Sequence, residues 1–127
     1  MSPASMSKIE NAIRIVLEFN VAFNNHNVEK MTSFFSVDCL LESPSPSPEG
    51  SLYSGKNTVT SYFQGFFRDH PDVSRKIEDI FSQGFQCVMR WRQTWVNHAG
   101  ENKSVRGVDI FKVKENRICE LYSYTKG

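Results

Sequence analysis

The chain has 127 residues, 39% of them hydrophobic and 13% aromatic, which is enough for one domain with a sizeable core and leaves no room for a second. Its 15 basic and 14 acidic residues give a net charge of +1 without a basic stripe, which argues against a dedicated nucleic-acid binder. The apolar runs are too short to span a bilayer, and no signal peptide is visible, so we expect a cytoplasmic protein without a membrane segment.

The cysteines and histidines do not form a metal-binding pattern. Cys39, Cys87 and Cys119 are an odd set without CxxC spacing, so we expect reduced core thiols rather than disulfides or metal ligands. The three histidines are scattered, and no pair has ligand spacing on one element. We therefore expect neither a metal nor a cofactor.

Three helices are predicted in the N-terminal half. Ser7-Lys8-Ile9-Glu10 fits a capping box, so the first helix is expected to begin there, after a flexible segment 1–6, and to end near residue 24. Asn27 can cap a short helix over residues 28–35. A third helix is predicted over 56–68, because the residue before Pro71 disfavours the helical region.

A proline-rich loop interrupts the helical half. Residues 39–42 are typical of a short strand, and the alternating serines and prolines of 43–48 that follow cannot join a sheet ladder. This segment is either a rim or lid over a cavity, or a plain surface connection.

Four strands with a period of two are predicted after the third helix, over residues 74–82, 85–97, 103–113 and 117–124. Ile77 and Phe81 should share one face of the first of these strands. Helices segregated from an antiparallel meander indicate an α+β architecture. If the helices cover the tryptophan-bearing face, the sheet must curve like a cone and leave a pocket between the layers.

Asp109 is the most informative residue of the third of these strands. It lies on the same face as Val105, Gly107, Phe111 and Val113, and a buried carboxylate is costly unless it is paired or protonated. It is either a general acid/base in an apolar pocket or a structural carboxylate. In the second case an arginine on a neighbouring strand, or a tyrosine hydroxyl such as that of Tyr122 or Tyr124, would hold it.

The order of these elements over residues 9–124 resembles the NTF2-like superfamily and, within it, the SnoaL-like polyketide cyclases and ketosteroid isomerases. The resemblance implies a cone-shaped, cystatin-like fold, with three helices on a strongly curved, mixed but mainly antiparallel sheet that encloses a pocket. It also implies a homodimer that forms through the sheet. The segments that carry it are Ala22-Phe23-Asn24-Asn25-His26-Asn27, Phe34-Phe35, Leu41-Glu42-Ser43-Pro44, Ser54-Gly55 and Gly107-Val108-Asp109-Ile110-Phe111.

The resemblance also indicates which chemistry to expect. Of the three catalytic positions of ketosteroid isomerase, Ser43 and Phe19 lack the required groups and only Asp109 is kept, so that activity is not expected. Epoxide-hydrolase-like chemistry needs an arginine where Gly107 stands. A scytalone-type dehydratase needs cavity histidines, whereas His26, His70 and His98 fall at helix ends or turns. The SnoaL-like cyclases imply that Asp109 moves a proton next to a carbonyl in an intramolecular aldol closure.

Two sets of residues complete the expectation. The pocket lining is predicted to comprise Phe19, Asn20, Ser43, Tyr53, Phe63, Phe67, Met89, Trp91, Phe111 and Tyr122. The apolar members fit a plain core equally well, and Asn20 also fits an amide bonded to backbone. The outer sheet face has an apolar centre and an arginine-rich rim, which suits either a homodimer or a solvated face. Its residues are Val88, Arg90, Arg92, Arg106, Val108 and Ile110.

Three hypotheses follow. The chain is a cofactor-free cyclase or isomerase acting on a hydrophobic carbonyl compound with Asp109 as acid/base, or a non-catalytic module that binds a small apolar ligand, or a protein-association domain.

Overall fold

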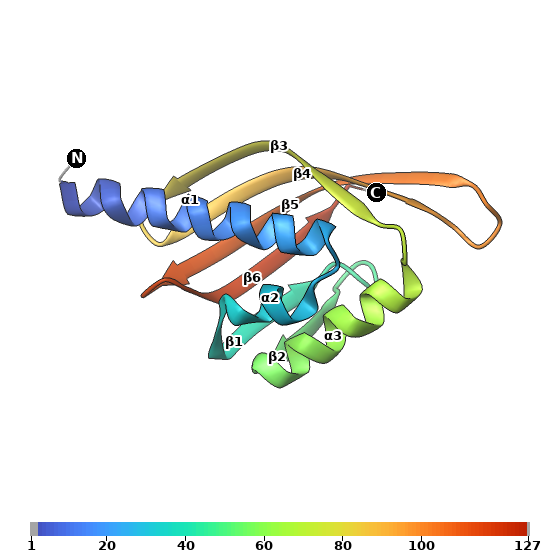
Figure 1. The fold of residues 1–127 in the computed structure, drawn as a ribbon, viewed down its shortest axis with the longest axis horizontal. Coiled ribbons are helices and arrows are strands. Elements are labelled where there is room, and N and C mark those ends of the chain that lie inside the picture. The colour runs from blue at the N-terminus through green and yellow to red at the C-terminus, as the bar shows by residue number, and fades with distance from the viewer. Residues whose placement is uncertain (1–2, 127) are drawn as a thin grey trace.

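The helices of the chain lie against one face of a curved sheet (Figure 1). The computed structural model describes residues 3–126, and these form α1 (Pro3–Asn24), α2 (Val28–Ser33) and α3 (Lys56–Asp69). α1 packs on strands β3 (Ser74–Gln83) and β4 (Gln86–Val96), whereas α3 packs on β1 (Phe35–Ser43) and β2 (Ser51–Ser54). None of the helices in the described range is long and apolar enough to cross a bilayer.

The first helix begins earlier than predicted. It starts at Pro3, so the predicted capping box at Ser7 lies inside the helix, and most of the segment 1–6 that we expected to be flexible is helical. Proline is well tolerated in the first turn, where its missing N–H has no partner to lose. Met1 and Ser2 lie outside the described residues. The predicted cap of α2 is confirmed, since Asn27 Oδ1 accepts a hydrogen bond from the Lys30 N–H at 3.0 Å.

The sheet has six strands in the order β2-β1-β6-β5-β4-β3, completed by β5 (Asn102–Lys114) and β6 (Arg117–Thr125). β1 pairs with β6 in parallel, and every other pairing is antiparallel, so the sheet is mixed and mainly antiparallel as expected. The sequence did not predict β2, and it predicted only the end of β1. β1 depends on its pairing with β6, which lies about eighty residues further along the chain. β2 has only four residues and follows a proline-rich loop, so it has little local signal.

The turn into β2 requires Gly50. Its φ is +76°, and a Cβ at this position would collide with the carbonyl oxygen of Ser43. Gly50 N–H also donates to the Pro46 carbonyl at 2.7 Å. The proline-rich loop is therefore closed on itself and brings β2 back beside β1.

A bulge in β3 overturns one predicted face. Ile77 pairs with Trp91, but the register then shifts, so that Ile80 pairs with Met89 and Phe81 with Val88. One inserted residue reverses the alternation of a strand. Phe81 therefore lies on the outer face, where 56% of it is exposed, and the prediction that it shares a face with Ile77 was wrong.

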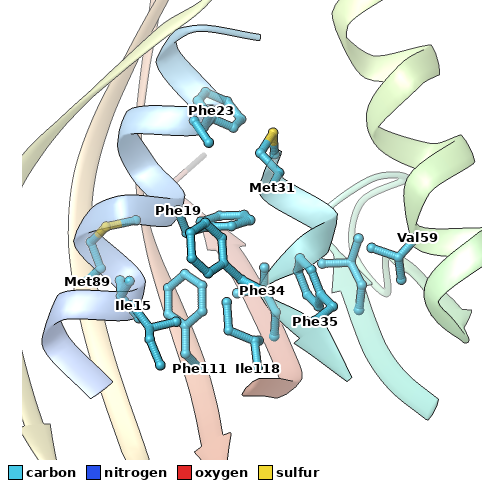
Figure 2. Close-up of a cluster of buried hydrophobic side chains, with 14 of the residues drawn as sticks. Ile15, Phe19, Phe23, Met31, Phe34, Phe35, Val59, Met89, Phe111 and Ile118 are labelled. Atoms are coloured by element: carbon cyan, nitrogen blue, oxygen red, sulfur yellow. The ribbon is translucent and has the colours of Figure 1, made fainter. Parts of the chain in front are cut away.

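The core fills the space between the helices and the inner face of the sheet (Figure 2). Phe19 of α1 is at its centre, with ring centroids 5.7 Å from Phe35, 5.7 Å from Phe111 and 6.1 Å from Phe63. The predicted inner face of β5 is confirmed, because residues 107, 109, 111 and 113 are all buried. The three cysteines are free thiols, two of them buried.

Candidate functional site: a buried ion pair and a cleft beside α3

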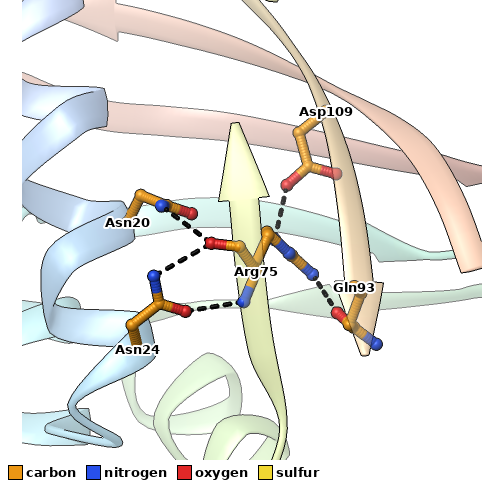
Figure 3. A network of polar contacts seen from close by, with 5 residues as sticks. All are labelled: Asn20, Asn24, Arg75, Gln93 and Asp109. Carbon is orange, nitrogen blue, oxygen red and sulfur yellow. Dashed lines mark hydrogen bonds and ion pairs between the residues drawn. The ribbon is translucent and has the colours of Figure 1, made fainter. Parts of the chain in front are cut away.

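Asp109 is enclosed and paired with an arginine. Only 1% of it is exposed, and its Oδ2 accepts a hydrogen bond from Arg75 Nη1 at 3.0 Å. Arg75 Nη2 donates to Gln93 Oε1 at 2.8 Å, so the guanidinium joins β3, β4 and β5 (Figure 3). The carboxylate thus has the arginine partner on another strand that one of the two sequence-based readings required. No pattern in the sequence indicated Arg75 as this partner.

Two aromatic rings pack against the guanidinium of Arg75. Its carbon lies 4.2 Å from the ring centroid of Phe23 and 4.2 Å from that of Trp91, which are cation–π distances. Burial lowers the pKa of Arg75, while the electrostatic influence of Asp109, and then of Tyr62, acts in the opposite direction. The ion pair is therefore sealed by apolar side chains on the side of α1 and on the side of the sheet.

Two asparagines of α1 bind the backbone of Arg75 (Figure 3). Asn24 Oδ1 accepts from the Arg75 N–H at 2.7 Å, and Asn24 Nδ2 donates to the Arg75 carbonyl at 2.9 Å. Asn20 Nδ2 donates to the same carbonyl at 3.3 Å. Asn20 is thus an amide bonded to backbone, and the pair fastens α1 to the edge strand β3.

Four buried polar atoms of this cluster have no hydrogen-bond partner among the described residues: Asn20 Oδ1, Arg75 Nε, Trp91 Nε1 and Asp109 Oδ1. Two of them are donors and two are acceptors. The second carboxylate oxygen of Asp109 is therefore buried and unengaged.

Gly107 leaves no space for a side chain. A Cβ there would collide with the indole ring of Trp91 and lie 2.5 Å from the carbonyl oxygen of Tyr124. The arginine that epoxide-hydrolase-like chemistry needs at this position has no room, which agrees with the sequence argument.

A separate cleft, which we call the α3 cleft, opens between α3, the proline-rich loop and the ends of β2 and β6. Its volume is about 890 Å³. Hydroxyl-bearing and aromatic side chains make up most of its wall, and the loop residues Pro44 to Ser47 form part of its rim. Asp109 does not line it. The lining residues are Ser43, Pro44, Ser45, Pro46, Ser47, Ser51, Tyr53, Thr58, Ser61, Tyr62, Gly65, Phe66, Asp69, His70 and Thr125.

A row of rings forms the aromatic part of that wall. The Tyr53 and Tyr62 centroids are 4.7 Å apart, Tyr62 and Phe66 6.3 Å, and Phe66 and His70 4.7 Å. Trp95 lies beyond His70 at 5.7 Å, edge to face. Burial raises the pKa of Tyr62 to about 12, with Tyr53 as the next cause, so the phenol keeps its proton at neutral pH.

The structure separates the predicted pocket residues into four groups. Ser43 and Tyr53 line the α3 cleft, and Asn20 belongs to the Arg75 cluster. Tyr122 lies on the outer sheet face, where its hydroxyl donates to Glu120 Oε1 at 2.8 Å, because it pairs with Ile110 of that face. The remaining residues are buried core: Phe19, Phe63, Phe67, Met89, Trp91 and Phe111.

Three ring-bearing cleft residues, Tyr62 and Phe66 of α3 and His70 directly after it, were not predicted, although a signal existed. Val59, Phe63 and Phe67 are the buried stripe of α3. Tyr62, Phe66 and His70 form a second stripe at the same four-residue spacing, displaced by one position. The two stripes were predicted as a single apolar face, so the cleft stripe was not distinguished from the core stripe.

The outer sheet face bears half-buried and exposed apolar side chains among charges. Val88, Val108 and Ile110 are half-buried, and Phe81 and Tyr124 are more exposed. Arg106 Nε donates to Glu78 Oε1 at 2.9 Å, so one predicted rim arginine is already paired. In the described range, 3–126, no group of three histidine, cysteine or acidic side chains is placed to hold a metal ion.

A profile of the SnoaL-like domain family matches residues 16–121. Among solved structures, an NTF2-like protein of unknown function from Mesorhizobium loti is 27% identical, with 94% of each chain covered and a TM-score of 0.81. A protein of Jannaschia sp. CCS1, provisionally named a SnoaL-like polyketide cyclase, is 14% identical, with 99% of this chain and 90% of its own covered and a TM-score of 0.84. TerC, co-crystallised with polyporic acid, is 12% identical, with 91% and 92% covered and a TM-score of 0.81. No curated protein sequence is a significant match.

Proposed function

Because the chain belongs to the SnoaL-like domain family, we propose that it binds a small apolar molecule that contains rings in the α3 cleft. The observation that carries this proposal is the row of aromatic rings in the cleft wall, together with hydroxyl groups of the loop and β2 that line the same cleft. The cleft volume of about 890 Å³ is in the range of small-molecule sites. TerC, which has the same fold, was co-crystallised with a small molecule, and this supports the proposal.

In this function Asp109 has a structural role. Its carboxylate neutralises the buried guanidinium of Arg75, and neither residue lines the cleft. A buried charge is tolerated when it is paired and hydrogen-bonded, and this arrangement meets both conditions.

Cofactor-free cyclase or isomerase chemistry is the second candidate. It is favoured by Asp109 Oδ1, which is buried without a hydrogen bond, and by the fold shared with the Jannaschia protein. The carboxylate would take the proton from the carbon next to a carbonyl, and the electron pair would move onto the carbonyl oxygen. This chemistry requires a substrate to reach Oδ1 past the side chains that enclose it.

Gly65 provides the test of cleft binding. It lines the cleft, and a Cβ added there meets only the flexible end of Arg68, at 3.4 Å. We expect Gly65→Phe to fill the cleft and to abolish binding of 2-methoxynaphthalene in a calorimetric titration. Gly65→Ala is the matched control, which should bind as the wild type does and gain roughly 0.5–1 kcal/mol of stability from helix propensity. Equal binding by Gly65→Phe and wild type, or no binding by the wild type, would contradict the proposal.

We also propose that two copies associate through the outer sheet face. The half-buried Val88, Val108 and Ile110 and the exposed Phe81 form an apolar centre, with arginines around it. Apolar patches with a charged rim are typical of protein interfaces. A sedimentation experiment that finds only monomer at micromolar concentration contradicts this proposal.

A further inference from the structure

The imidazole ring of His70 is held in one orientation at the end of α3. The Phe66 carbonyl accepts two hydrogen bonds from this residue, one from its backbone N–H at 2.9 Å and one from its ring Nδ1 at 3.1 Å. A carbonyl oxygen only accepts, so Nδ1 carries the hydrogen, and the neutral ring has its lone pair on Nε2. Stacking on Phe66 and the edge contact with Trp95 fix the plane of the ring.

The other ring nitrogen of His70, Nε2, has no hydrogen-bond partner in the described part of the chain. His70 is a half-buried residue of the cleft wall. His26 is different, although it is also a stacked histidine at a helix end. Its Nε2 lies 2.7 Å from the Val73 carbonyl, it stacks on Phe67, and it is outside the cleft.

We propose that His70 Nε2 accepts a hydrogen bond from the molecule bound in the α3 cleft, so that His70 selects ring compounds that carry a hydroxyl or N–H group at their edge. This inference rests on the proposed binding function and adds the residue that discriminates between ligands. A site built to hydrogen-bond a ligand hydroxyl discriminates against an analogue that lacks it, because the buried acceptor is then left unpaired.

The other end of the wall complements this acceptor. Tyr62 is eight residues before His70 on α3, which corresponds to about 12 Å along the helix axis. Its phenol keeps its proton because burial raises its pKa to about 12. The α3 wall thus presents a phenol hydroxyl at Tyr62, a flat ring at Phe66 and a nitrogen that can accept. Asp69, beside His70, also lines the cleft and can accept a hydrogen bond, and the experiment must distinguish the two.

The experiment compares 2-naphthol with 2-methoxynaphthalene, which share a ring system and differ in the hydroxyl hydrogen. Calorimetric titrations would use the full-length wild type, His70→Phe and His26→Phe. The first variant keeps a ring against Phe66 but removes the acceptor, and the second is the matched control outside the cleft. We expect the wild type and His26→Phe to prefer 2-naphthol by roughly 3- to 10-fold, the contribution of one neutral hydrogen bond, and His70→Phe to lose the preference.

A second measurement does not depend on any variant being folded. In the wild type, 2-naphthol should shift the nitrogen NMR resonance of His70 Nε2, whereas 2-methoxynaphthalene should leave it in place. A preference that persists in His70→Phe assigns the contact to another acceptor, such as Asp69, and overturns the inference while cleft binding stands. Equal affinity of the wild type for both compounds also overturns it. If the wild type binds neither compound, the proposed function fails together with the inference.

Discussion

At the scale of single residues, the ion pair of Asp109 and Arg75 determines how the core tolerates charge. The two side chains are 1% and 10% exposed, and Gln93 and two rings complete their surroundings. Removing one partner of a buried pair leaves an uncompensated charge, whereas replacing both with apolar groups is often neutral. Each of the two charges therefore requires the other, although the ion pair as a whole adds little net stability.

Asp109→Asn should test this role. We expect it to lower the free energy of unfolding by about 3–5 kcal/mol, because the Arg75 guanidinium is then buried without a counter-charge. The double variant Arg75→Met with Asp109→Leu should recover most of this loss. Urea unfolding followed by circular dichroism measures both. If Asp109→Asn is as stable as the wild type, Arg75 does not need the carboxylate. That result would favour a catalytic role for Asp109.

Tyr62 should make the protein sensitive to alkali. Burial raises its pKa from 10.0 in the unfolded chain to about 12 in the folded one. Between these pH values the unfolded state binds fewer protons than the folded state. The stability that protonated Tyr62 contributes is therefore complete below about pH 10 and is lost as the pH rises towards 12, a loss of about 2 kcal/mol. Tyr62→Phe should lose less stability across this window and should lack the latest step in the tyrosinate absorbance titration. Tyr124→Phe, at an exposed tyrosine, is the control that should keep this step.

At the scale of elements, Asn24 joins a helix to an edge strand. Its amide pairs with both the N–H and the carbonyl of Arg75, in the way that a neighbouring strand would. This contact, with the bond from Asn20, fixes β3 against α1 at the place where Arg75 enters the core. The position of the arginine thus depends on two amides of a different element.

Asn24→Ala should loosen this end of β3. The loss of two hydrogen bonds should reduce stability by about 1–3 kcal/mol and should speed hydrogen exchange of the Arg75 amide relative to the centre of β4. Asn24→Asp keeps the acceptor for that amide and should protect it better than alanine does. Unchanged exchange in Asn24→Ala would mean that the side chain does not secure the strand.

Predictions at this scale succeeded where the signal was local. The long strands and α3 have clear periodicity and turn residues, and their expected ranges agree with the structure to within a few residues. The face of Phe81 was wrong because a bulge depends on pairing with β4 and has no local pattern. β2 was missed because four residues carry too little periodicity, although Gly50 gives the turn that precedes it.

At the scale of the whole molecule, the two faces of the sheet have different roles. The inner face and the helices make a filled core, and the α3 cleft lies at one side of it. The outer face is left to solvent or to a second copy.

Ile110→Asp tests the association of two copies. It places a charge in the centre of the outer face, between Val88 and Tyr122 on the neighbouring strands. We expect the wild type to sediment as a dimer at micromolar concentration and Ile110→Asp as a monomer with an unchanged circular dichroism spectrum, because a desolvated charge without a partner opposes association. Leu17→Asp, at an exposed position of α1, is the control that should remain dimeric. A dimeric Ile110→Asp protein would place the contact elsewhere.

The sequence by itself determined the order of the helices and of every strand except β2, the inner face of β5 and the resemblance to the SnoaL-like family, which the family match confirms. These follow from periodicity, turn chemistry and order along the chain, which are properties of neighbouring residues. Only the tertiary structure decided that Arg75 pairs with Asp109, 34 residues away, and that the open cleft lies beside Tyr62, Phe66 and His70 and not over Asp109. The physical reason is that partners and cavities are fixed by packing between distant segments, and a small shift in register or helix rotation changes which side chains meet.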